Sequence, residues 1–258
     1  MKTFLSLVSC VLPIMLFAQT PFDGTWKTDF AESKLSQKLY EYSVNNGLYD
    51  CKSCAPEINV MADGQDHAVT GQSFDTMAVQ IVDANTIHLT GKKAGNIQFE
   101  TTRTASQDGE ILTSTTTVYA ADGSQAYKAE GKYTRVSKGS GGSNATSGSW
   151  RVQNINEDAA GLFSTWMSAG DKLSMSTPAG ISWEGKLDGK EYRVKENSTR
   201  ETVSLKRLGE RSIKVTIRRD GKIEWVEKIT VSSDGRKMTS IVDNKLTGRV
   251  STYVAEKQ

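Results

Sequence analysis

Apolar and polar residues alternate along much of the chain. Strict alternation is typical of β-strands that bury one face and expose the other to water. Thr, Val, Ile and aromatic residues are frequent in the alternating segments, which favours a pleated sheet. The clearest alternating positions are Ile87, Leu89, Ile97, Phe99, Val203, Leu205, Ile213, Val215 and Ile217. No long amphipathic helix is predicted, although residues 157–166 have room for one short turn or helix.

Turn signals separate the alternating segments. Glycine accepts positive φ without steric cost, so Asn-Gly and Asp-Gly pairs between such segments indicate hairpins. These pairs fall at residues 46–47, 63–64, 108–109, 122–123, 188–189, 220–221 and 234–235. We therefore expect about eight short antiparallel strands in each half of the chain.

The chain contains one unit twice. Residues 76–114 align without gaps to residues 202–240, with the turn Ser106–Gly109 opposite Ser232–Gly235. Self-similarity at a long period is the sequence signature of a duplicated structural unit. The match extends from Gly24-Thr25-Trp26-Lys27, opposite Gly148-Ser149-Trp150-Arg151, to Tyr133, opposite Tyr253.

A Gly/Ser-rich stretch at residues 137–147 lies between the two copies. Such a composition cannot bury apolar area and is typical of a flexible linker. We expect one domain over residues 19–136 and a second over 148–258. A closed barrel or a two-sheet sandwich would hide the apolar face of each half. A single membrane barrel of about sixteen strands is the alternative, but a lipid-facing band with aromatic girdles is missing.

The first residues predict export. Residues 1–18 hold a short basic start, an apolar run and a small residue at Ala18, which is the layout of a cleaved signal peptide. We expect a secreted or periplasmic protein. No later stretch reaches the roughly 20 apolar residues that a spanning helix needs, so stable membrane insertion is not expected. Lys and Arg number 32 against 30 for Asp and Glu, a balance that argues against a nucleic-acid partner.

Two cysteines remain once Cys10 has left with the signal peptide, and both lie in Cys51-Lys52-Ser53-Cys54. In an oxidising compartment this spacing favours a disulfide that closes a tight loop. A redox pair would need a helix N-terminus inside a βαβ unit. A metal site would need a second pair of ligands. We therefore predict a Cys51–Cys54 disulfide.

The opening Gly-x-Trp of each copy resembles that of the lipocalin-like superfamily of small antiparallel barrels. The resemblance implies two tandem up-and-down barrels whose floors are closed by Trp26 and Trp150, with a basic residue from the last strand across each ring. It suggests Arg135 for Trp26, whereas residues 253–257 offer no arginine for Trp150. The chain is also similar to uncharacterised exported bacterial proteins that open with Gly-Thr-Trp-Lys. The Thr-Asp-Tyr-type motif of true lipocalins is missing.

Candidate catalytic chemistry is sparse. His67 lies opposite Tyr192 in the repeat, which favours a packing role, and His88 lies on the polar side of its strand. No nucleophile elbow, phosphate loop or dinucleotide fingerprint is present. The sequence predicts neither an enzyme, nor a cofactor, nor a metal site.

The resemblance implies a small hydrophobic or amphipathic ligand in one or both barrels, whose binding residues the sequence does not name. A structural or interaction module with solid barrels is the alternative, and an extracytoplasmic enzyme is the third reading. Small cavity-side candidates in the first half, which would leave space, are Thr101, Ser114 and Thr116. Large candidates in the second half, which would fill it, are Trp225 and Met238.

Overall fold

The computed structural model describes residues 20–194 and 201–258, and the predicted signal peptide at 1–18 lies outside this range. Within it, strands form two antiparallel sheets of ten strands each. The single helix, α1 (Ala159–Leu162), falls inside the segment expected to hold a short helix. The predicted all-β class is therefore confirmed, with ten strands in each sheet instead of about eight.

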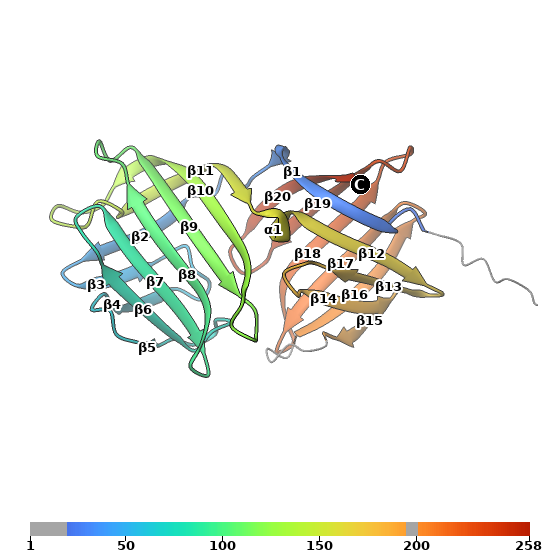
Figure 1. Ribbon diagram of the computed structural model, residues 1–258, viewed down its shortest axis with the longest axis horizontal. Coiled ribbons are helices and arrows are strands. Elements are labelled where there is room, and N and C mark those ends of the chain that lie inside the picture. Colours follow the sequence, from blue (N-terminus) through green and yellow to red (C-terminus); the bar gives the residue numbers. More distant parts are fainter. Residues whose placement is uncertain (1–19, 195–200) are drawn as a thin grey trace, which may run out of the picture.

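The first sheet, called barrel I, curls until its edges approach each other (Figure 1). Its edge strands are β4 and β5, and an isolated bridge connects Asp63, just after β4, to Gln80 of β6 near the other edge. Its strands are β2 (Tyr40–Asn45), β3 (Leu48–Cys51), β4 (Ile58–Met61), β5 (His67–Ala68), β6 (Thr76–Ile81), β7 (Thr86–Lys93), β8 (Asn96–Ala105), β9 (Ile111–Tyr119), β10 (Gln125–Lys138) and β11 (Gly148–Glu157).

The second sheet, called barrel II, lies beside the first and repeats its strand order, with β14 and β15 at its edges (Figure 1). Its strands are β1 (Gly24–Lys34), β12 (Phe163–Ala169), β13 (Lys172–Ser176), β14 (Ser182–Lys186), β15 (Asp188–Arg193), β16 (Glu201–Gly209), β17 (Ser212–Arg219), β18 (Lys222–Val231), β19 (Lys237–Asn244) and β20 (Arg249–Lys257).

The two copies exchange their first strands. β1 begins the chain but lies in barrel II between β12 and β20, while β11 begins the second copy but lies in barrel I between β2 and β10. Figure 1 shows blue β1 among the orange and red strands of the other barrel. The sequence-predicted domains at 19–136 and 148–258 therefore do not coincide with the two sheets.

The Gly/Ser-rich stretch forms the loop of the β10–β11 hairpin. Its end is packed: Thr146 and Ser147 are buried. The amides of Asn144 and Ala145 donate to the carbonyls of Val44 and Ala84, which anchors the loop on barrel I. The prediction of a flexible interdomain linker at 137–147 is therefore wrong. Composition showed the lack of apolar area, but backbone hydrogen bonds hold this loop.

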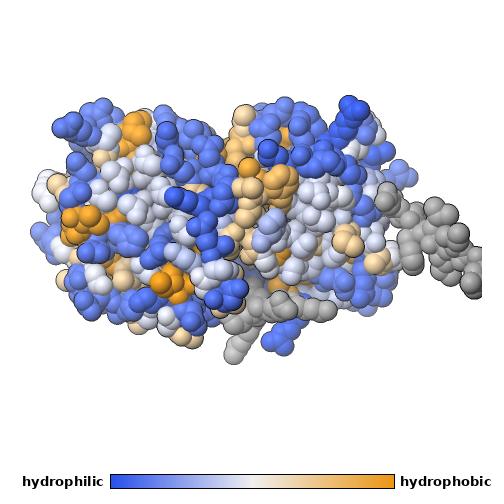
Figure 2. Space-filling model, viewed as in Figure 1, coloured by the Kyte–Doolittle hydropathy of each residue, from blue (hydrophilic) through white to orange (hydrophobic). Residues whose placement is uncertain are grey.

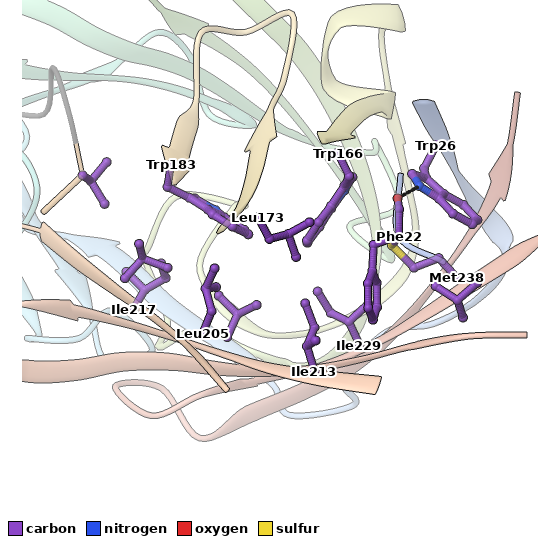
Figure 3. Close-up of a cluster of buried hydrophobic side chains, with 14 residues drawn as sticks. Phe22, Trp26, Trp166, Leu173, Trp183, Leu205, Ile213, Ile217, Ile229 and Met238 are labelled. Carbon is purple, nitrogen blue, oxygen red and sulfur yellow. Dashed lines mark hydrogen bonds between the residues drawn. The ribbon is translucent and has the colours of Figure 1, made fainter. Parts of the chain in front are cut away.

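Barrel II has a dense apolar core. Figure 3 shows side chains from its two walls pointing toward one another, with Phe22 beside Trp26 at one end. The rings of Trp166 and Trp183 meet edge to face at 5.2 Å, a favoured aromatic geometry. Met238 is buried here, as the sequence suggested, and Trp225 packs against the core from its margin.

The face of the molecule seen in Figure 2 is mostly hydrophilic, with apolar residues in small patches and in a strip along the junction of the barrels. Scattered exposed apolar residues are ordinary for a folded protein. Among the described residues, no helix has the length and hydropathy to cross a membrane.

Candidate functional site

The two tryptophans of the Gly-x-Trp motifs are fully buried and equivalently placed. The indole N–H of Trp26 donates to the carbonyl of Phe22 at 2.8 Å, and that of Trp150 donates to the carbonyl of Thr146 at 2.9 Å. Each tryptophan thus fixes the turn that leads into its own strand. Because a buried N–H needs an acceptor, this bond also satisfies the one polar atom of each ring.

A basic side chain from the last strand of each copy, β10 or β20, covers each ring. The guanidinium of Arg135 lies 4.0 Å from the centre of the Trp150 ring, and the ammonium of Lys257 lies 5.4 Å from that of Trp26. The predicted pairing of Arg135 with Trp26 is therefore wrong, because the exchanged strand places Trp150 beside β10. In the second copy, whose last strand has no arginine at 253–257, Lys257 provides the basic side chain, and it lies over Trp26.

The glycine of each motif leaves space for the chain segments that bring the basic side chain over the tryptophan ring. Gly24 and Gly148 have φ of +128° and +135°, a backbone conformation that residues with a side chain rarely adopt. A Cβ on Gly24 would lie 2.6 Å from Cε of Lys257, and one on Gly148 would lie 2.2 Å from the carbonyl oxygen of Ser137. The Gly-x-Trp motif is thus a structural unit in both barrels.

Cys51 and Cys54 form the predicted disulfide, with their Cα atoms 5.4 Å apart. Cys51 is buried in the core of barrel I and Cys54 packs against that core. The bond ties the segment after β3 to the barrel wall, where Cys54 and Ala55 border a pocket.

This pocket, of about 280 Å³, opens in barrel I and is called the mouth pocket. Its lining is mainly aliphatic and aromatic, and it includes Thr101, one of the small residues that the sequence placed on the cavity side. Barrel I contributes Tyr49, Cys54, Ala55, Ile58, Gln72, Phe74, Met77, Leu89, Phe99, Thr101 and Arg103, and barrel II contributes Asn244, Leu246 and Thr247. A mostly apolar hollow with a few polar groups is typical of a small-molecule site.

Arg103 brings a positive charge into this pocket. Its guanidinium stacks 4.1 Å from the centre of the Tyr42 ring, and Nη1 donates to the hydroxyl of Tyr49 at 2.9 Å. Both tyrosines are buried, and burial raises the pKa of Tyr42 above its ordinary value. The stacking fixes the plane of the guanidinium, and arginine remains charged at physiological pH.

The β19–β20 hairpin of barrel II forms one wall of the mouth pocket. Arg249 anchors it: the guanidinium lies 4.1 Å from the centre of the Tyr40 ring. The same side chain donates to the carbonyls of Leu39, at 2.8 Å, and Ser53, at 3.3 Å. The pocket is therefore built from both barrels.

Other hollows lie elsewhere among the described residues, including two of about 310 and 320 Å³ at the loops of barrel I. One of about 410 Å³ lies between β1 and the end of β11 and is bordered by Glu157, whose pKa burial and the neighbouring Asp158 raise to about 7. One of about 300 Å³ lies over β13–β15 beside Trp183 and Tyr192.

The histidines occupy structural positions. The imidazole of His67 pairs with Asp63 at 2.8 Å, as the hydroxyl of its repeat counterpart Tyr192 pairs with Asp188 at 2.9 Å. His88 is half exposed and contacts Thr102 at 3.1 Å. Across residues 20–194 and 201–258, no cluster of His, Cys, Asp and Glu is arranged to hold a metal ion.

No protein-family model matches the chain, and no curated protein and no solved structure is significantly similar to it. The candidate site is therefore defined by its geometry alone.

Sequence reasoning missed Arg103, although a signal was present. The ungapped repeat places Arg103 opposite Ile229, and Thr101 opposite Glu227. Both pairs fall on the inward-facing side of their strands, because Ala105 and Ile229 on the same faces are buried. A charged residue opposite an aliphatic core residue marks the position where the two interiors differ in chemistry.

Proposed function

We propose that this chain is an exported, lipocalin-like binding protein that holds one small amphipathic molecule in the mouth pocket of barrel I. The observation that carries the proposal is the pocket itself: about 280 Å³, an apolar lining and one fixed charge. Export is supported by the leading segment and by the Cys51–Cys54 disulfide, since such bonds persist in oxidising compartments.

The two barrels have different tasks under this proposal. Most of the interior of barrel II is filled by its own side chains, among them Trp166, Leu173 and Trp183 (Figure 3), and the hollow beside Trp183 lies at its β13–β15 wall. It supplies the hairpin that walls the site. The alternative of a packed module without a ligand fits barrel II, and binding measurements on the whole chain decide between the two for barrel I.

The test is titration of the mature chain with a neutral, environment-sensitive naphthylamine dye. We expect saturable binding of about one dye per chain, because the mouth pocket is the hollow among the described residues whose mainly apolar lining comes from both barrels. Ala55→Trp, at the pocket edge, should weaken binding by at least about tenfold. Ala121→Trp, in the exposed β9–β10 turn, is the matched control and should bind as the wild type does.

Two outcomes would overturn the proposal. One is a wild-type chain that shows no saturable dye binding. The other is equal binding by both tryptophan variants, which would place the dye elsewhere on the molecule. Near-ultraviolet circular dichroism of each variant establishes that the barrels are intact when the dye is added.

A further inference from the structure

The mouth pocket has a marked charge asymmetry. Among the described residues that line it, Arg103 is the only one with a formal charge. Within residues 20–194 and 201–258 no carboxylate pairs with it, and its polar and ring contacts are the hydroxyl of Tyr49 and the ring of Tyr42. A half-buried cation without a counter-ion is unfavourable unless a ligand or water compensates it.

The donors around this charge are arranged to meet an anion. Only Nη1 of Arg103 is engaged, so the rest of the guanidinium edge is available. The fully buried hydroxyl of Tyr49 accepts from Arg103 and so helps to hold the guanidinium in place. A guanidinium edge matches the two oxygens of a carboxylate or a similar anionic group.

The fold itself does not require an arginine at this position. The repeat counterpart, Ile229, is fully buried in barrel II and packs in an apolar core. An aliphatic side chain therefore suits this place in the barrel. The charge in barrel I is a local departure from the repeated pattern, as expected of a binding residue.

The remaining walls suit a short apolar body. Leu89, Phe99 and Met77 line one side and Leu246 of the hairpin lines another. The volume of about 280 Å³ lies just below the usual range for small-molecule pockets. A large multi-ring or double-chain lipid would exceed this space.

We infer that the ligand is an amphiphilic monoanion, whose head lies against the guanidinium edge of Arg103 and whose short apolar body lies against the aliphatic and aromatic wall. This inference rests on the proposed function, because it names the chemical class of molecule that the same site takes.

The experiment compares one short alkyl chain carrying four different heads: carboxylate, sulfate, alcohol and trimethylammonium. Each compound displaces the neutral dye from the whole mature chain. We expect the two anionic compounds to bind at least about tenfold more tightly than the alcohol, and the cationic compound to bind most weakly. The ratio between carboxylate and sulfate identifies the preferred anionic head, and either order supports the inference.

Variants locate the preference. Arg103→Ile introduces the residue of the second copy and should remove the anion preference while the alcohol still binds. Arg103→Lys keeps the charge and should retain part of the preference. Arg151→Ile, on the exposed side of β11, makes the same chemical change outside the pocket and should leave the preference unaltered.

The failures are distinguishable. Equal binding of alcohol and carboxylate by the wild type, or an anion preference that survives Arg103→Ile, would overturn the inference while leaving the proposed function in place. Displacement of the dye by no member of the series, or no dye binding at all, would overturn the proposed function itself. The head-group comparison uses the wild type alone, so it remains a valid test even if a variant folds poorly.

Discussion

The basic residues over the two buried tryptophans differ in how firmly they are held. Arg135 stacks on Trp150 and also donates to the carbonyls of Ala145, at 2.6 Å, Ser147, at 2.7 Å, and Gly109. Lys257 lies farther from Trp26. Arg135 thus ties three loop carbonyls to the floor of barrel I, whereas Lys257 mainly covers a ring.

Removing Arg135 should cost more stability than removing Lys257. We expect Arg135→Met to lower the free energy of unfolding by about 2–4 kcal/mol, through the lost stacking and the carbonyls left without donors. Lys257→Met should cost about 0.5–1 kcal/mol. Urea unfolding followed by tryptophan fluorescence measures both values. An equal or larger loss for Lys257→Met would contradict this account of the two floors.

At the level of single residues, the sequence named those that build the barrels. Trp26, Trp150, Arg135 and the Cys51–Cys54 bond were found because short motifs and spacing mark them. The partner of Arg135 was misassigned, since the motif does not say which copy supplies the strand. Arg103 carries no motif, and its environment appears only once the barrel has closed around it.

The exchange of β1 and β11 has a simple physical explanation. Both strands carry the same Gly-x-Trp pattern, so either one fits beside the last strand of either barrel. Sequential strands usually pair, because a short loop costs little closure entropy. β11 follows β10 directly and pairs with it, which leaves the slot beside β20 for β1.

Alternation located the strands well, because it is a local property. The hairpins predicted at 63–64 and 188–189 are wrong, since the strands that flank these pairs are the two edge strands of each sheet and do not pair. The glycines at 64, 109, 123, 189, 221 and 235 all adopt the positive φ that the turn signals predicted. Strand exchange is not local, and two equivalent strands give the same pattern in either arrangement. For the same reason, composition could not distinguish a linker from the loop of a packed hairpin.

Glu157, at the end of β11, makes the stability of the fold depend on pH. Burial and the neighbouring Asp158 raise the pKa of Glu157 to about 7 from its ordinary value of 4.5. The folded state therefore disfavours the charged carboxylate. Stability is unaffected well below pH 4.5, falls as pH rises from 4.5 to 7, and levels off above 7.

Glu157→Gln should remove the loss of stability that the wild type shows between pH 4.5 and 7. Relative to the wild type, we expect the variant to gain about 1–2 kcal/mol of unfolding free energy at pH 8, after allowance for solvent screening, and almost nothing at pH 4. Urea unfolding at both values provides the comparison. Glu57→Gln, at an exposed position, is the control. A gain at pH 4 equal to that at pH 8 would show that charge is not the cause.

At the scale of the whole molecule, two kinds of contact join the barrels. The chain crosses from barrel II to barrel I after β1 and returns after β11, so neither sheet is complete without the other copy. The β19–β20 hairpin adds a second connection through Arg249 and the mouth pocket. The two barrels should therefore unfold together rather than as independent domains.

The strand exchange is the central claim, and a pair of thiols tests it. In the exchanged fold Lys27 lies opposite Glu256, on the last strand of barrel II. The same position in the other copy, Arg151, lies opposite Thr134 in barrel I. Without exchange, residue 27 would lie opposite residue 134 instead.

The measurement is bridging by a short, thiol-specific dibromobimane in two double variants, Lys27→Cys with Glu256→Cys and Lys27→Cys with Thr134→Cys. The native cysteines are already joined to each other. The account predicts rapid intramolecular bridging in the first variant and none in the second, read as bimane fluorescence and as the linked peptides in mass spectra. Bridging of residues 27 and 134 in a monomeric chain would contradict it.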